Sequence, residues 1–268
     1  MSRERLDVLL TDRGLAPSRE KAHAYILAGL ARVDGRTVDK PGTKVLTDAV
    51  IELADTGPGY ASRGGLKLAG AAETFGIVFT GRVMLDVGAS TGGFTDYALQ
   101  HGASRVYAVD VGYGQLDWRL RQDERVVVME RTNIRYVKPE SFPETFDICT
   151  IDVSFISLAL VLPPVSQLLK PDGEVVALVK PQFEAGREFV GKRGVVKDAA
   201  VHTAVLRQVI QKAEATGLWV SAVCYSPITG PNGNIEFFVH LCRDSTRKME
   251  LLPIEELVQS AHSALRGE

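Results

Sequence analysis

The sequence predicts an α/β fold: an open, mostly parallel sheet with helices on both faces and a final antiparallel strand pair, preceded by a small α+β domain. From Gly81 onward, apolar strand-like runs alternate with helical segments, which is typical of a parallel sheet covered on both faces. The last two runs are joined by Pro227 to Asn234, a loop too short for a helix, so we expect them to pair antiparallel. Near the N-terminus, Asp34-Gly35 lies between alternating runs, which is a strong hairpin signal.

The small domain is expected over residues 1–58. Leu6, Leu9 and Leu10 form one face of a first helix that Gly14 can end, and Ser18 is a plausible N-cap for a second helix. The remaining expected features are, in order, the inward face of the second helix (Ala22, Tyr25, Ile26), Gly29 after its end, hairpin strands 31–33 and 36–38, and a strand at 50–53.

A linker separates this domain from the larger one. The stretch 55–59 is rich in glycine and proline, and we place the linker at 59–65 and the larger domain at 66–268. Its expected strands lie near 82–87, 105–110, 126–130, 146–152, 174–180, 219–226 and 235–242, and its helices near 66–75, 93–101, 114–121, 157–169, 199–216 and 254–265.

Composition places the chain among ordinary globular proteins. It has 268 residues, 45% hydrophobic and 24% charged, enough for one large and one small domain. No apolar run approaches the length of a membrane span, and the N-terminus lacks a signal-peptide pattern, so we expect a cytoplasmic protein. The three cysteines show no metal-ligand spacing, and we expect no metal site. The apolar runs around Cys149 and Cys224 indicate buried thiols.

A glycine-rich turn stands between the strand Val83-Met84-Leu85 and the next helix. Its pattern, D-x-G-x-x-x-G-G from Asp86 to Gly93, lets a ligand lie close to the backbone, but it does not fit the dinucleotide pattern G-x-G-x-x-G. A nucleotide-dependent oxidoreductase is therefore disfavoured. A purely structural turn between strand and helix remains the alternative.

The acids at two strand ends indicate the ligand. Asp86 can accept from a cationic amine, and Asp110, at the end of the next strand, can bind the two hydroxyls of a ribose. An ammonium group and a ribose without a pyrophosphate describe S-adenosylmethionine. The predicted cofactor contacts are Asp86, Gly88, Ser90, Thr91, Gly92, Gly93, Phe94, Asp110 and, near the adenine, Asn133.

Four charged residues are expected to converge on the same edge of the sheet. Asp152 and Lys180 follow two strands, Glu236 lies near the turn of the antiparallel pair, and Lys67 precedes the first strand. Methyl transfer to a hydroxyl requires loss of the hydroxyl proton, and a second ammonium nearby would lower the pKa of a lysine base. We choose Lys180 to activate or steer the hydroxyl. The alternative is two ordinary ion pairs, Asp152–Lys180 and Lys67–Glu236.

Positive charge gathers at the two helix starts of the small domain. Residues 1–47 hold nine Lys or Arg against six Asp or Glu. Such a cluster can contact phosphates, although a solvated helix face has the same composition. The residues predicted to contact phosphates are Arg3, Arg5, Arg19 and Lys21 in this domain, Arg63, and Arg131 near the pocket mouth.

Six motifs in order resemble the TlyA family, whose members are similar to 2′-O-ribose methyltransferases of ribosomal RNA and have also been labelled hemolysins. The motifs lie at 88–95, 110–116, 130–133, 154–157, 179–184 and 230–236. The resemblance implies a Rossmann-like class I methyltransferase sheet that uses S-adenosylmethionine, with an N-terminal RNA-binding domain similar to that of a small-subunit ribosomal protein. It implies a Lys-Asp-Lys-Glu tetrad at Lys67, Asp152, Lys180 and Glu236.

The implied substrate is a cytidine 2′-hydroxyl of ribosomal RNA in assembled ribosomal subunits. Some members of the family modify both subunits and others the large one, and Arg3 with Arg5 resembles the broader group. Two other functions remain open at this point: a membrane-active cytolysin, disfavoured by the absence of a basic amphipathic helix, and a non-catalytic RNA-binding ribosome factor, disfavoured by the intact tetrad. Glycines and basic residues at 183–197 also indicate a mobile loop or an ordinary surface loop, and the oligomeric state is not defined.

Overall fold

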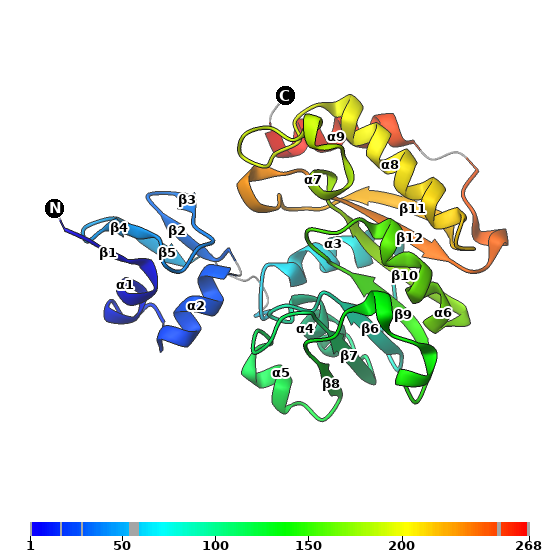
Figure 1. Cartoon of the computed structure of the whole chain (residues 1–268), viewed down its shortest axis with the longest axis horizontal. Coiled ribbons are helices and arrows are strands. Elements are labelled where there is room, and N and C mark those ends of the chain that lie inside the picture. Colours follow the sequence, from blue (N-terminus) through cyan, green and yellow to red (C-terminus); the bar gives the residue numbers. More distant parts are fainter. Residues whose placement is uncertain (1, 17, 28, 54–58, 251–252, 267–268) are drawn as a thin grey trace.

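The computed structural model describes residues 2–16, 18–27, 29–53, 59–250 and 253–266. Figure 1 shows a small N-terminal unit beside a larger unit built on one twisted sheet. The helices are α1 Leu6–Asp12, α2 Arg19–Leu27, α3 Gly64–Phe75, α4 Gly93–Gln100, α5 Trp118–Gln122, α6 Leu162–Leu168, α7 Pro181–Glu184, α8 Ala199–Glu214 and α9 Ile254–Arg266.

The small unit packs two helices on short strands. The predicted hairpin is confirmed: β2 (Ala31–Val33) pairs with β3 (Arg36–Thr37), and Asp34 and Gly35 both have positive φ, as such a tight turn requires. The predicted strand β5 (Ile51–Leu53) adds to β2. A second sheet, β1 (Arg3–Arg5) with β4 (Lys44–Leu46), was not predicted, because β1 is short, polar and without an apolar alternation.

The larger unit contains a seven-stranded sheet in the order β11-β12-β10-β9-β6-β7-β8. The neighbours from β10 to β8 are parallel, whereas β12 is antiparallel to both β10 and β11, so the predicted mixed sheet is confirmed. The carboxyl ends of β6, β9 and β10 therefore meet at one edge. The strands are β6 Val83–Val87, β7 Arg105–Val109, β8 Val126–Met129, β9 Phe146–Ile151, β10 Leu169–Val179, β11 Trp219–Tyr225 and β12 Phe237–Cys242.

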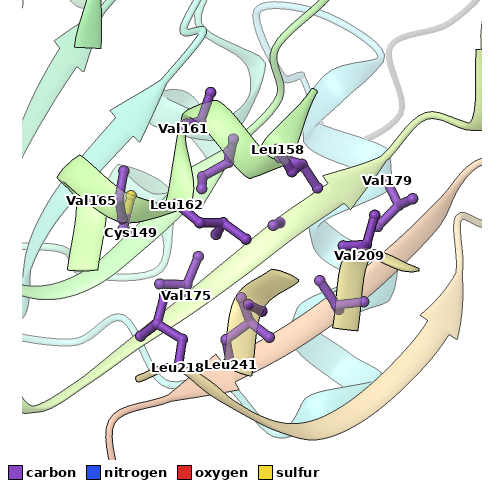
Figure 2. Close-up of a cluster of buried hydrophobic side chains, with 14 of the residues drawn as sticks. Cys149, Leu158, Val161, Leu162, Val165, Val175, Val179, Val209, Leu218 and Leu241 are labelled. Atoms are coloured by element: carbon purple, nitrogen blue, oxygen red, sulfur yellow. The ribbon is translucent and has the colours of Figure 1, made fainter. Parts of the chain in front are cut away.

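Helices bury both faces of the sheet. On one face, α6, α8 and α9 cover a cluster that includes Val165, Val175 and Val209, and Figure 2 shows these side chains interleaved with Cys149. On the other face, α3, α4 and α5 pack through residues such as Leu68. All three cysteines are buried, and burial raises the pKa of the Cys149 thiol, so these groups are unreactive, as expected.

Several helices differ from their expected bounds, among them α8, which ends at Glu214 and not at 216. The helix α3 begins at Gly64, two residues earlier than expected. The expected helix at 114–121 is confined to α5, which begins after Asp117 accepts from the Arg119 amide. The expected helix at 157–169 is split into a 3₁₀ turn, Leu158–Leu160, and α6, because Pro163 and Pro164 lack the amide hydrogens that a continuous helix needs.

The two units contact each other beside the carboxyl edge of the sheet. Lys21 Nζ on α2 lies 2.7 Å from Asp117 Oδ2 at the start of α5. Both side chains are largely shielded from solvent, which strengthens the ion pair relative to a fully exposed one. Among the described residues, no helix has the length and apolar character needed to cross a membrane.

Candidate active site at the carboxyl edge of the sheet

A cavity of about 470 Å³ lies where the small unit meets the carboxyl edge of the sheet. Its floor is the glycine turn between β6 and α4, and its walls come from α3, the ends of β9 and β10, and the loop before β12. The hairpin of the small unit contributes Arg32, Arg36 and Thr37. Residues from both units thus form a single site.

The glycine turn is packed too tightly to accept side chains. Gly88 has a φ of +86°, and a Cβ there would lie 2.4 Å from the carbonyl oxygen of Asp152. At Gly93 a Cβ would lie 2.3 Å from Ser62 Oγ. Gly88 is partly exposed and Gly93 is buried, and both line the cavity together with Ser90, Thr91 and Phe94.

Asp110 lies against the same turn. Its Oδ2 accepts from the Ser90 amide at 2.9 Å, and its Oδ1 accepts from the Gly112 amide at 2.7 Å. Each carboxylate oxygen can accept a second bond, so the group retains capacity for a pair of ligand hydroxyls. Asn133 caps the short 3₁₀ turn Ile134–Tyr136 and accepts from the Arg135 amide, and it is not among the residues that line this cavity.

Asp86 occupies a different place from the one expected. Its side chain is fully buried, Oδ2 accepts from Thr95 at 2.7 Å, and Oδ1 accepts from Thr150 at 2.9 Å. Burial raises the pKa of this carboxyl to about 7, although the two threonine hydroxyls act in the opposite direction. Asp86 thus does not face the cavity, where a contact with a cationic amine was expected. Its two hydrogen bonds instead link α4 and β9 next to the glycine turn.

The four charged residues do converge. Lys67 Nζ donates to Glu236 Oε2 at 2.7 Å, and Lys180 Nζ lies 2.6 Å from Asp152 Oδ1 and donates to Ser154 Oγ at 2.9 Å. Lys67, Asp152 and Lys180 line the cavity, whereas Glu236 is fully buried behind Lys67. The two expected ion pairs therefore exist, and they share one cavity with the glycine turn.

The surroundings of Lys67 raise its pKa. Burial by itself lowers the pKa of this ammonium, but the carboxylates of Glu236 and Asp152 outweigh burial and raise it. The pKa of Asp152 is lowered, because Lys180 and Lys67 together outweigh the opposite effect of its burial. Lys67 is thus a fixed ammonium in this arrangement and is unsuited to act as a base.

The predicted RNA-binding residues fall into separate groups. Arg63 is at the cavity, where its guanidinium donates to the Thr229 carbonyl at 3.4 Å, and burial with the nearby Arg32 lowers its pKa. Arg131 lies over the ring of Tyr113, 4.2 Å from its centroid. Of the others, Arg3 is exposed on β1, Arg5 and Arg19 bind the carboxylate of Asp7, and Lys21 contacts Asp117.

Sequence reasoning missed several residues at this site. Arg32 and Arg36 were not singled out, since they lie in a short hairpin and only the assembly of the two units brings them to the cavity. Phe155, just past β9, is 90% exposed with a φ of +63°, and its ring lies 4.9 Å from that of Phe183. An aromatic residue directly after Asp152-Val153-Ser154 was the available signal. Within the described residues, no group of three or more His, Cys, Asp or Glu is placed to hold a metal.

Comparisons with known proteins agree with this geometry. Residues 60–243 match the FtsJ-like methyltransferase family, and residues 4–51 match the S4 domain. The chain is 51% identical to "Putative rRNA methyltransferase YqxC" of Bacillus subtilis, over 98% of this chain and 96% of that protein. It is 45% identical to "16S/23S rRNA (cytidine-2'-O)-methyltransferase TlyA" of Mycobacterium tuberculosis, over 97% and 98%.

A solved structure extends the likeness to three dimensions. "Putative hemolysin from Streptococcus thermophilus" superposes with a TM-score of 0.80 at 45% identity, and the match covers 100% of this chain and 98% of that one. The likeness to this structure thus extends over the residues of both units.

Proposed function

The chain belongs to the TlyA family of FtsJ-like methyltransferases, and on that premise we propose that it methylates a cytidine ribose 2′-hydroxyl of ribosomal RNA in ribosomal subunits. One observation carries the proposal: Lys67, Asp152 and Lys180 line one cavity beside the glycine turn, with Glu236 buried behind Lys67. Relatives named for the same activity support it. An rRNA substrate also implies action in the cytoplasm.

The glycine turn fits S-adenosylmethionine, which supplies a methyl group made electrophilic by a positively charged sulfur. Gly88 lines the cavity without a side chain, so a ligand there can lie close to the main chain. Asp110 retains acceptor capacity next to Ser90, as binding of two ribose hydroxyls requires. The backbone of Gly88 to Gly93 and the Asp110 carboxylate are therefore the groups proposed to hold the donor, with Asn133 near its adenine.

Lys180 is the residue we assign to activate or steer the 2′-hydroxyl. It lines the cavity and is held from two sides by Asp152 and Ser154, so its amine has a fixed position. The pKa of Lys67 is raised and that of Asp152 is lowered, so Lys67 helps to keep Asp152 ionised, which orients Lys180 through Asp152. Fixed placement of the hydroxyl beside the donor accounts for most of the acceleration expected of such a site.

The RNA is proposed to enter from the side on which the two units meet. Arg63, Arg32 and Arg36 surround the cavity there, and guanidinium groups bind phosphates through two parallel hydrogen bonds. The S4 domain match supports an RNA-binding role for the small unit. A nucleotide within a folded rRNA helix would have to swing out of its stack to reach Lys180.

Substitution of Lys180 tests the catalytic assignment. We expect Lys180→Ala and the longer apolar Lys180→Met to lose methyl transfer to ribosomal subunits while S-adenosylmethionine binding, measured by calorimetry, is retained. Lys170→Ala is the matched control, since Lys170 lies at the start of β10, at the end opposite to Lys180, and pairs with Asp147. Retained transfer in both Lys180 variants would refute the assignment, and mapping of ribose methylation on the rRNA identifies the nucleotide.

A further inference from the structure

A second basic surface lies next to the active site, on the far side of the loop before β12. It is a shallow pocket of about 810 Å³, and four of its lining residues are cationic: Lys192, Arg193, Lys197 and Arg266. Asp198 is the acid among them, and its carboxylate is occupied in capping α8 through the Ala200 amide. The pocket therefore presents a strongly positive surface.

Three of these cations are free to meet a ligand. Lys192, Arg193 and Lys197 are exposed, and within the described part of the chain none of them forms an ion pair. Arg266 differs, because it donates to the carbonyls of Lys197 and Val196 and so supports the loop. Phe189, 53% exposed, adds an aromatic ring to the rim of the same pocket.

The loop that carries these cations has a defined shape. The Gly194 amide donates to the Gly191 carbonyl at 2.8 Å, and the Gly191 amide donates to the Val195 carbonyl at 3.1 Å. Lys192 and Arg193 therefore occupy the tip of a closed turn. Their side chains extend from a fixed backbone, which reduces the entropy lost when they bind.

Two asparagines fasten this turn to the active site. Asn234, almost fully buried, donates to the Gly194 carbonyl at 2.9 Å and accepts from the Val196 amide at 3.1 Å. Asn232 donates to the Arg193 carbonyl at 3.2 Å. Glu236 follows two residues after Asn234, and Asn232 with Gly233 lines both the active-site cavity and the basic pocket. The basic turn thus has a fixed position relative to the tetrad.

We infer that Lys192, Arg193 and Lys197 form a binding site for the RNA backbone that flanks the target nucleotide. The inference rests on the proposed function, because RNA whose ribose lies in the cavity must leave it across one of its walls. The wall at residues 231–233 leads directly to three unpaired cations and an exposed ring, the combination that binds single-stranded phosphates and bases. This site belongs to the larger unit, and none of its lining residues comes from the small unit.

A binding titration against salt tests the inference. The probe is the unmodified ribosomal subunit that the wild-type enzyme methylates, and the variants are Lys192→Ala/Arg193→Ala and the same pair with Lys197→Ala. Each lost phosphate contact is expected to lower the slope of log Kd against log salt by about 0.7–0.9. When the salt concentration rises from about 50 to 200 mM, the ratio of the double variant's Kd to the wild-type Kd should fall by roughly tenfold. KM should rise while kcat at saturating RNA stays within about twofold.

Lys170→Ala/Lys248→Ala is the control for loss of two positive charges. Lys170 begins β10 and Lys248 follows β12, so both lie at the sheet edge opposite to the active site, where they pair with Asp147 and Glu214. The control should keep the wild-type slope and KM. Unchanged slopes in the double and triple variants, or an equal loss in the control, would overturn the inference. Failure of the wild-type enzyme to methylate any subunit would instead overturn the proposed function, and the two results are separate measurements.

Discussion

The buried pair Lys67–Glu236 provides a direct test of how the site is stabilised. Its side chains are 11% and 0% exposed, and Gly230 packs so closely on Glu236 that a Cβ there would lie 2.1 Å from Oε1. Removal of one partner leaves the other charge buried without its counter-ion, at a cost of about 3–5 kcal/mol. Lys67→Met and Glu236→Leu should each destabilise the protein by this amount. In a domain of this size, that corresponds to a fall in Tm of about 6–20 °C.

The double variant Lys67→Met/Glu236→Leu should recover most of this loss. Replacement of a buried ion pair by apolar side chains of similar volume is often neutral for stability, because neither charge then has to be desolvated. The assay is thermal unfolding of the four proteins by calorimetry, together with methyl transfer to ribosomal subunits. The double variant should be inactive although it is stable.

The reasoning would be refuted if the single variants melted within about 2 °C of the wild type, since the pair would then contribute no more than a surface ion pair. A double variant as unstable as the sum of the two single variants would also contradict it, because the loss would then come from packing and not from an unpaired charge.

Three further predictions follow from the geometry. Gly88→Ala should weaken S-adenosylmethionine binding, measured by calorimetry, at least about tenfold. An alanine at this positive φ is strained by about 1–2 kcal/mol, and its Cβ would collide with the Asp152 carbonyl. The control Gly76→Ala, also at positive φ but in open space, should bind the donor normally. Asp86→Asn should stabilise the protein above pH 7, because the folded-state pKa of Asp86, about 7, lies above the ordinary value for a carboxyl group. The wild type therefore loses about 1.4 kcal/mol of stability per pH unit as the pH rises from about 4 to 7. Urea unfolding of both proteins at pH 4 and pH 8 measures the difference. Asp7→Asn should destabilise the small unit at pH 7 but not at pH 2. The hydrogen bond from Arg5 lowers the pKa of Asp7 to about 2, so the stability that the ionised carboxylate contributes is lost as the pH falls from about 4 toward 2. Equal hydrogen exchange in α1 for both proteins at pH 7 would contradict the prediction.

The sheet was predictable because its strands are apolar on both faces. Runs such as 83–87 and 146–151 are buried almost throughout, and burial on both faces produces continuous apolar segments that stand out in the sequence. The short strand β1 gave no such signal, since Arg3, Glu4 and Arg5 pair through their backbone alone. Helix bounds were less predictable, because capping by Asp117 and the prolines of α6 decide them locally.

At the site, sequence position indicated which residues lie close together, but not how neighbouring groups shift their pKa values or orient their side chains. A second ammonium nearby was expected to lower the pKa of a lysine base, yet the pKa of Lys67 is raised, because the carboxylates of Glu236 and Asp152 outweigh its burial. Asp86 stands at a strand end like Asp110, but its position in β6 turns it toward Thr95 and Thr150. These orientations depend on contacts between residues far apart in the chain.

The cavity that both units line has a consequence for how the enzyme distinguishes among RNAs. Leu27 and the hairpin residues Arg32 and Arg36 form one side, and the sheet edge with Lys67 and Lys180 forms the other. A short RNA fragment can satisfy one side without the other, whereas a large folded RNA can engage both at once. Under the proposed function, an RNA that contacts both sides of this entrance at once gains affinity from two linked surfaces, beyond what either surface provides alone.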